Sequence, residues 1–219
     1  MIFIEFDSAG WMFPFGFGVA AYIQDNFETD TIQFGGTSAG ACCALALAAR
    51  VPIRPYFEDA INVNRFNPFR MADAVKDVLV TQKYQRLPDT GQVRIGLSEA
   101  NYVWQKMRRV VVQDFEDWDH AVECVRASCH LPILAGFRGY SIGGRRYFDG
   151  GCTRTAPPRD TVFVSPWTKS SENCIGTDVR FPKLWSYFPP RPQVLQQIFR
   201  LGYLRSELFF RDVKKLDKH

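Results

Sequence analysis

Short apolar runs alternate with segments of helical composition along the first fifty residues. The apolar runs at 1–6 and 31–35 predict two strands. Residues 18–27 and 39–50 have the composition of helices, and the glycine-containing segment 7–18 is expected to be a loop. A strand, loop, helix, strand, turn and helix in this order favour an α/β fold with a parallel sheet.

The rest of the chain is less regular, but its pattern predicts further elements. Helices are expected at 56–64, 71–80, 116–128 and 191–215, and strands at 93–98, 108–115, 145–151 and 161–166. Breaks are expected at 65–70 and 86–92, and the last helix is expected to be interrupted at Gly202. With 219 residues, of which 46% are hydrophobic, the chain is expected to form one domain over 1–219.

Charge and hydropathy exclude some classes of partner. The 27 Lys and Arg residues are dispersed among 23 Asp and Glu, and no basic stripe of the kind that follows phosphates occurs. Nucleic acid is therefore not expected as a partner. No stretch of 18 or more apolar residues predicts a membrane-spanning helix. Aromatic residues gather in "GWMFPFGF" and "FPKLWSYFPP", which are either core segments or an apolar lip toward a lipid surface.

The six cysteines show neither a CxxC pair nor a Cys/His metal spacing. Two of them, Cys42 and Cys43, are adjacent inside a predicted buried helix. Reduced structural thiols are therefore expected, and no metal is. The N-terminal apolar run is too short, and too soon acidic, for a secretory signal. The expected location is intracellular, in the cytoplasm.

The pentapeptide Gly36-Thr37-Ser38-Ala39-Gly40 follows a predicted strand and precedes a predicted helix. A G-x-S-x-G sequence in this context is typical of a sharp turn that lifts the serine hydroxyl clear of the backbone. The amides at the start of the following helix point toward an oxyanion formed there. Ser38 is therefore a candidate nucleophile, and the alternative is an ordinary helix N-cap.

A nucleophilic serine needs a base, and the three histidines are poorly placed for that role. His120 lies in a polar predicted helix, His130 precedes "LP", and His219 is the last residue. Asp149, in "RRYFDGG", ends a predicted strand before two glycines that allow a sharp turn. A carboxylate with an ordinary pKa of about 4 needs desolvation and a close hydroxyl to act as a base. The alternative is that D-G-G forms a simple turn.

GTSAG, a later DGG and no well-placed histidine together resemble the patatin-like phospholipases, which use a Ser-Asp dyad. The similarity is to the animal adiponutrin and adipose triglyceride lipase branch. Ser128, Cys129 and Pro132 match its "SC-x-x-P" element, and "GGRRYFDGG" resembles its "RGVRYVDGG". The segments "TVFVSPW", "SENCIG" and "FPPRPQVLQQIFRLGY" also resemble the branch, in the same order. The resemblance implies a three-layer α/β fold whose mostly parallel central sheet is flanked by helices.

The same resemblance implies roles for particular residues. Ser38 is expected to be the nucleophile and Asp149 the general base. The backbone amides of Gly10 and Ala39 are expected to form the oxyanion hole, with Ala9 and Trp11 as further candidates. In the family, part of this hole comes from a loop resembling G-x-G-x-x-G. The aligned segment here is "SAGWMF", in which only one glycine matches.

The expected function is that of a serine lipid acyl hydrolase, a carboxylic ester hydrolase, with triacylglycerol as the implied substrate class. Phospholipase A or lysophospholipase activity, and acyl transfer by the same fold, are alternatives. A histidine-triad esterase using His130 or His120 is another, as is a lipid-binding protein whose oxyanion hole is degraded by Ser8 and Phe13. The chain is expected to be a minimal catalytic domain without a cofactor. Its expected partners are a lipid ester, a membrane or lipid-droplet surface contacted peripherally, and an unidentified co-activator protein.

Overall fold

The computed structural model describes residues 2–62, 86–153, 155 and 160–216, with side chains up to residue 212. The break expected at 65–70 and the helix expected at 71–80 lie outside these residues.

The centre of the fold is an eight-stranded sheet in the order β5-β6-β3-β2-β1-β7-β8, with β4 also paired to β3. Its strands are β1 (Ile2–Phe6), β2 (Ile32–Thr37), β3 (Val93–Glu99), β4 (Arg108–Val112), β5 (Tyr140–Ile142), β6 (Arg145–Phe148), β7 (Thr161–Val164) and β8 (Cys174–Ile175). Strands β3, β2, β1, β7 and β8 pair in parallel, whereas β4, β5 and β6 pair antiparallel. The predicted α/β fold, with a mostly parallel sheet flanked by helices, is confirmed.

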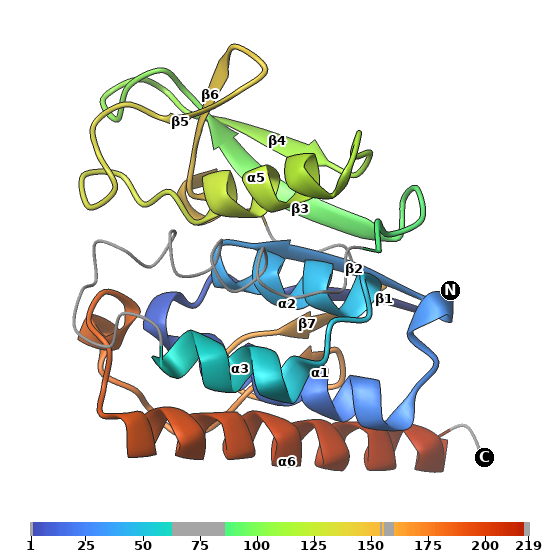
Figure 1. Ribbon diagram of the computed structural model, residues 1–219. Coiled ribbons are helices and arrows are strands. Elements are labelled where there is room, and N and C mark those ends of the chain that lie inside the picture. Colours follow the sequence, from blue (N-terminus) through green and yellow to red (C-terminus); the bar gives the residue numbers. More distant parts are fainter. Residues whose placement is uncertain (1, 63–85, 154, 156–159, 217–219) are drawn as a thin grey trace.

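Helices pack on this sheet and on one another (Figure 1). Within the described residues the α-helices are α1 (Phe13–Asn26), α2 (Ala39–Ala48), α3 (Ile53–Asn62), α5 (Trp118–Ser128) and α6 (Pro192–Leu216). Short 3-10 helices are η1 (Gly10–Met12), η2 (Thr29–Thr31), η4 (Gly150–Thr153) and η5 (Lys183–Ser186). Helix α2 contacts β1, β2 and β3, α5 contacts β3, and α1 packs between α2, α3 and α6.

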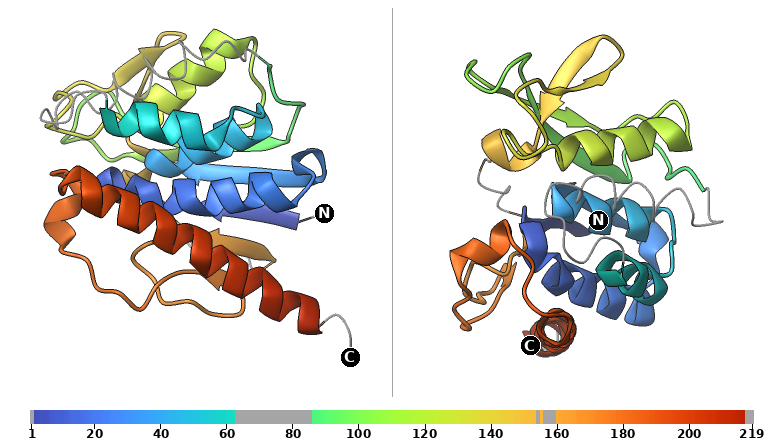
Figure 2. Two further views of the ribbon diagram at one scale, coloured as in Figure 1. Left: turned by 60° about the horizontal axis from the view of Figure 1, so that its bottom comes forward. Right: turned by 60° about the vertical axis from the view of Figure 1, so that its left-hand side comes forward.

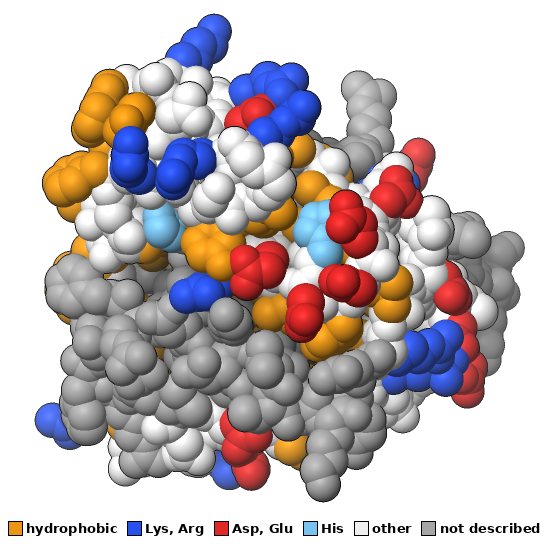
Figure 3. Space-filling view, turned by 45° about the horizontal axis from the view of Figure 1, so that its top comes forward, with side chains coloured by type: hydrophobic (Ala, Val, Ile, Leu, Met, Phe, Trp, Pro, Cys, Tyr) orange, Lys and Arg blue, Asp and Glu red, His pale blue; other side chains and the backbone are white. Residues whose placement is uncertain are grey.

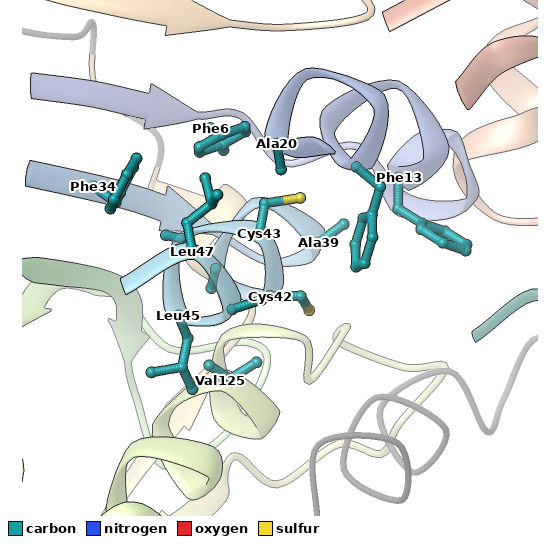
Figure 4. Packing of buried hydrophobic residues seen from close by; sticks show 14 of the residues in the cluster. Phe6, Phe13, Ala20, Phe34, Ala39, Cys42, Cys43, Leu45, Leu47 and Val125 are labelled. Atoms are coloured by element: carbon teal, nitrogen blue, oxygen red, sulfur yellow. The ribbon is translucent and has the colours of Figure 1, made fainter. Parts of the chain in front are cut away.

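Helix α2 lies at the centre of the core, and every one of its side chains is buried. Its sequence is alanine, glycine, cysteine and leucine, so it has no polar face to turn toward water. Figure 4 shows Leu45 of this helix beside Val125 of α5, and Cys43 on the side toward Ala20 of α1. The small side chains let sheet and helices approach α2 closely, which fixes the position of its first residue, Ala39.

The loop expected at 7–18 is wrong, because α1 already begins at Phe13. The misleading signals were a proline and two glycines. Pro14 lies in the first turn of α1, where no helical hydrogen bond to its nitrogen is needed. A Cβ at Gly18 would lie 2.0 Å from the carbonyl oxygen of Phe199, so this glycine allows close helix packing. The side chains of "GWMFPFGF" are buried, and this segment is core, not an apolar lip.

The interruption expected at Gly202 is also wrong, because α6 continues through this residue. A Cβ at Gly202 would lie 2.1 Å from the carbonyl oxygen of Phe15. Glycine is therefore needed for the close approach of α6 to α1, and the two helices lie side by side in Figures 1 and 2. The burial of one face of α6 outweighs the low helix propensity of glycine.

Strand β1 begins and helix α6 ends at one end of the molecule (Figures 1 and 2). The loops that follow the parallel strands β1, β2 and β3 lie at the opposite end. Ligands of open α/β sheets bind at this carboxyl edge of the strands. Ser38, which directly follows β2, lies at this edge.

Candidate active site

Ser38 occupies a strained turn between β2 and α2. Its backbone angles are φ 54° and ψ −127°, a conformation that costs a residue with a side chain about 1–3 kcal/mol. Ser38 stands at the N-cap position of α2, but its hydroxyl makes no capping hydrogen bond to the helix. The Ser38 hydroxyl therefore does not act as an ordinary helix N-cap.

The two outer glycines of the pentapeptide make this turn sterically feasible. A Cβ at Gly36 would lie 2.3 Å from the carbonyl oxygen of Gly40. A Cβ at Gly40 would lie 2.3 Å from the carbonyl oxygen of Phe6 on β1. Both distances are far inside van der Waals contact, so the sharp turn and its seat on the sheet require glycine at both positions.

The Ser38 hydroxyl donates a hydrogen bond of 2.6 Å to Oδ2 of Asp149, a residue 111 positions later in the chain. The other carboxylate oxygen, Oδ1, accepts a bond of 2.8 Å from the amide of Gly151. Ser38 is 2% and Asp149 3% exposed. A buried hydroxyl thus donates directly to a carboxylate whose orientation is fixed by the following turn, as general-base activation of a serine requires.

Burial raises the pKa of Asp149 from 3.8 to about 6, because desolvation disfavours the charged carboxylate. The hydrogen bonds from Ser38 and Gly151 act in the opposite direction and limit the rise. The carboxylate is therefore a stronger base than an exposed aspartate, yet it is still ionised near neutral pH.

The backbone of Asp149 is held on both sides. Its amide donates to the carbonyl oxygen of His130 at 2.9 Å, and its carbonyl oxygen accepts from the hydroxyl of Ser98 at 2.7 Å. Ser98 belongs to β3, and His130 belongs to the segment that follows α5. The carboxylate is thus anchored to the sheet and to the end of a helix.

A small cavity with about 10 Å³ of free volume lies at the start of α2. Ala9, Ala39 and Gly40 line it. Of the expected oxyanion-hole residues, the structure therefore brings Ala9 and Ala39 together. The N-terminus of α2 at this cavity contributes a dipole that favours negative charge.

Gly10 and Trp11 do not line this cavity. Gly10 has φ 55° and packs so closely on η5 that a Cβ would lie 2.0 Å from the carbonyl oxygen of Ser186. Trp11 is buried in η1. The loop before them is held by Asp7, whose carboxylate accepts from the amide of Ser8 at 2.8 Å and the hydroxyl of Ser165 at 2.6 Å.

Comparison with known proteins finds sequence relatives that include patatin-like phospholipase domain-containing proteins. The chain is 23% identical over 245 residues to mouse patatin-like phospholipase domain-containing protein 5, covering 94% of this chain and 55% of that protein. It is 24% identical over 237 residues to mouse omega-hydroxyceramide transacylase, covering 91% of this chain and 39% of that one. A third relative, mouse 1-acylglycerol-3-phosphate O-acyltransferase Pnpla3, is 28% identical over 66% of this chain and 38% of its own length. The chain thus spans about half, or less, of the length of these curated relatives.

The fold is similar to that of VipD from Legionella pneumophila, with a TM-score of 0.56 and 10% identity over 96% of this chain and 67% of that chain. No protein-family model matches the chain. The chain is thus similar in sequence to members of the patatin-like phospholipase family. The family comprises lipid acyl hydrolases and transacylases.

The two described histidines, His120 and His130, make hydrogen bonds elsewhere. The ring of His130 makes a 3.0 Å hydrogen bond through Nε2 to the carbonyl oxygen of Arg138, and burial lowers its pKa. The Nδ1 atom of His120 accepts a hydrogen bond from the amide of Glu116 at 3.2 Å. Within the described residues neither ring bonds to the Ser38 hydroxyl, and His219 lies outside them. The geometry gives no support to a histidine triad built on His120 or His130.

Ser128 lies in the candidate site, a position that the sequence did not assign to it. Its fully buried hydroxyl accepts a hydrogen bond of 2.7 Å from the amide of Ser38 and donates one of 2.7 Å to the carbonyl oxygen of Gly96. It therefore ties the strained turn to β3. The available signal was its place in the "SC-x-x-P" element, but a contact across 90 residues cannot be read from spacing.

The six cysteines are all free thiols. Cys42, one turn after Ser38, has its sulfur 4.0 Å from that of Cys129. Burial raises the pKa of the Cys43 thiol, and the hydrogen-bonding contact with Cys42 together with burial raises that of Cys129, so both thiols stay protonated. In the described part of the chain, no three His, Cys, Asp or Glu side chains are grouped to hold a metal ion.

Proposed function

We propose that the chain is a serine acyl hydrolase that acts on lipid esters through a dyad of Ser38 and Asp149. The observation that supports this most strongly is the 2.6 Å hydrogen bond from the Ser38 hydroxyl to the buried carboxylate of Asp149. Similarity to the patatin-like family supports the lipid class of substrate. The implied substrate class is triacylglycerol, with phospholipids and lysophospholipids as the alternative.

The reaction follows from this geometry in two halves. Ser38 Oγ attacks the ester carbonyl carbon while its proton passes to Asp149 Oδ2, and the oxyanion forms beside the amide of Ala39. The ester C–O bond then breaks, and the leaving alcohol takes the proton from Asp149. Water attacks the acyl-enzyme, gives a proton to the same carboxylate, and the Ser38 oxygen recovers that proton as the fatty acid departs.

The oxyanion hole is proposed to use the amide of Ala39 together with the loop at Ala9. Gly10 then acts through its backbone conformation, since its positive φ directs the chain from the cavity into η1. In this arrangement the segment "SAGWMF", with one glycine, takes the place of the family loop that resembles G-x-G-x-x-G. If it fails to stabilise an oxyanion, the alternative is a lipid-binding protein of the same fold.

Acyl transfer is a second candidate for the same dyad. Two relatives are named as an omega-hydroxyceramide transacylase and a 1-acylglycerol-3-phosphate O-acyltransferase. Transfer differs from hydrolysis only in the acceptor that attacks the acyl-enzyme, which is an alcohol in place of water. A product analysis that separates free fatty acid from transferred acyl groups distinguishes the two.

Peripheral contact with a lipid surface is part of the proposal. No described helix is both long and apolar enough to cross a bilayer. Trp104 is 71% and Phe137 59% exposed, and their loops are joined by a hydrogen bond from the amide of Val103 to the carbonyl oxygen of Phe137. Exposed aromatic side chains of this kind suit the interface of a lipid surface. The face over α5, drawn in Figure 3, mixes such hydrophobic side chains with separate groups of acidic and basic ones.

The test is a lipid-ester panel combined with a fluorophosphonate probe that labels activated serines. The wild-type chain is compared with Ser38→Ala and Asp149→Asn, and His130→Ala serves as a control outside the proposed dyad. Probe labelling and ester cleavage are expected in the wild type and the control. Ser38→Ala is expected to lose probe labelling. The rate of ester cleavage is expected to fall at least about a hundredfold in both dyad variants. Equal turnover in all four proteins would overturn the proposal.

A further inference from the structure

A groove of about 540 Å³ lies between η5 and the segment that follows β7. Its size falls within the range of about 300–1,000 Å³ that is usual for small-molecule sites. Trp167, Phe181 and Tyr187 give it an aromatic wall. Lys169, Arg180 and Lys183 add three cations to the lining. The groove therefore offers an apolar surface and positive charge in the same place.

The groove adjoins the candidate active site. The indole nitrogen of Trp167 donates a hydrogen bond of 3.2 Å to the carbonyl oxygen of Ser8, at the start of the loop of the proposed oxyanion hole. Pro166 lines both the groove and the small cavity at Ala39. In the right-hand view of Figure 2, the orange segment that contains η5 lies beside the dark-blue chain after β1. The groove and the small cavity beside Ala39 thus share Pro166 as a common wall.

The positive charge of the groove is not neutralised by the protein. Within the described ranges, Lys169, Arg180 and Lys183 take part in no ion pair. Asp178 is the acid in the lining, and its carboxylate lies 3.5 Å from a guanidinium nitrogen of Arg205, which compensates its charge. Free cations beside a carboxylate that already has a partner favour an anionic ligand.

The apolar part of the groove is also open to a ligand. Val179 is 48% and Tyr187 50% exposed, although both side chains are hydrophobic and lie in the groove lining. Covering such surface releases free energy in proportion to the apolar area removed from water. An acyl chain or the glycerol backbone of a lipid supplies the matching apolar surface.

We propose that this groove binds the head-group end of a glycerolipid with an anionic phosphate head group. The cations of the groove hold the phosphate, the aromatic wall packs on the adjoining apolar part, and the ester reaches Ser38 past Pro166. The inference rests on the proposed hydrolase function and favours a charged glycerolipid over triacylglycerol as the substrate.

The test measures binding without turnover, using the full chain with Ser38→Ala. A short-chain lysophosphatidylglycerol, kept below its critical micelle concentration, is titrated by isothermal calorimetry. Lysophosphatidylcholine of the same chain length is the zwitterionic comparison. Saturable binding is expected, at least about tenfold tighter for the anionic lipid. Adding Lys183→Glu or Arg180→Glu is expected to weaken that binding about tenfold, whereas Arg145→Glu, with the same charge change on the β5–β6 hairpin, leaves it unchanged.

The outcomes separate this inference from the proposed function. If the wild type cleaves esters but its Ser38→Ala form binds both lipids equally, or Lys183→Glu has no effect, the groove assignment is wrong and the hydrolase proposal stands. If anionic lipid binds as expected but no ester is cleaved, the groove assignment stands and the hydrolase proposal fails. Equal weakening by Arg145→Glu indicates attraction by overall charge only and overturns the assignment.

Discussion

Replacing Asp149 by asparagine is expected to stabilise the protein at neutral pH while removing its activity. The carboxylate is 3% exposed, and its burial raises the pKa from 3.8 to about 6. The folded state therefore favours the protonated carboxyl more than the unfolded state does. Binding of a proton by Asp149 therefore stabilises the folded state. This contribution is fully present at pH values below 3.8 and is lost as the pH rises through about 6.

The magnitude follows from the two pKa values. The difference between 3.8 and about 6 corresponds to about 3 kcal/mol of stability lost above pH 7. Asparagine has almost the same shape and carries no charge, so Asp149→Asn avoids this loss. Its side-chain oxygen still accepts from the amide of Gly151, and its NH2 group donates to the Ser38 hydroxyl. We expect a gain of up to about 3 kcal/mol, or about 6–12 °C in Tm for a chain of this size.

The assay is denaturant unfolding of wild type and Asp149→Asn at pH 7.5 and pH 5, followed by tryptophan fluorescence. The gain is expected to be largest at pH 7.5, about half as large at pH 5, and nearly absent at about pH 3. Over the same series, ester cleavage by the variant is expected to be about 10²–10⁴-fold slower at pH 7.5, because the base is gone. Stability and activity thus change in opposite directions, as is common at catalytic sites.

Two results would refute this reasoning. A loss of stability at pH 7.5 would mean that the ionised carboxylate is held by hydrogen bonds worth more than its desolvation costs. A gain of the same size at pH 5 and pH 7.5 would mean that the titration of Asp149 is not its source. Asp117→Asn is the matched control, since this aspartate is exposed and its carboxylate caps α5. It is expected to show no comparable gain.

Three further predictions follow from the site. Ser128→Ala leaves the amide of Ser38 and the carbonyl of Gly96 without their buried partner, so unfolding measurements are expected to show a loss of about 2–3 kcal/mol, and kinetics a lower kcat. Gly36→Ala brings a Cβ within 2.3 Å of the Gly40 carbonyl, so expression and thermal melting are expected to reveal a destabilised chain whose turn no longer holds the serine. The kcat/KM for a soluble ester is expected to fall about tenfold per pH unit below about 6, and a profile flat down to pH 5 contradicts the proposed base.

The pattern of apolar residues predicted the elements that pack on one face or are wholly buried. The strands β1, β2, β3 and β7 and the helices α2 and α5 lie where the sequence placed them within a few residues. Glycine and proline misled the prediction in α1 and α6. In isolation these residues indicate turns, but here Gly18 and Gly202 allow two helices to touch. The partner that needs the glycine is distant in sequence, so the local pattern could not distinguish the two cases.

In the candidate site, too, some features could be predicted from local sequence and others depend on packing. Its candidate residues could be named from the sequence, because G-x-S-x-G and D-G-G have a local meaning and the lack of a well-placed histidine favoured an aspartate as the candidate base. That Ser38 and Asp149 meet at 2.6 Å, and that Ala9 and not Gly10 lines the small cavity, depends on how the chain packs. The sequence showed the segments that contain Ser38 and Asp149, but not that the two side chains lie within hydrogen-bond distance.

The sequence by itself therefore determined the class of fold, the family resemblance and the residues available for chemistry, since these depend on local pattern and residue type. The tertiary structure decided which residues share a site and how strongly each is buried. Hydrogen bonds across 90 and 111 residues, and the desolvation that raises the pKa of Asp149 to about 6, arise only when sheet and helices exclude water together. The groove beside η5 belongs to the same category, because packing alone brings its aromatic and cationic side chains into one lining.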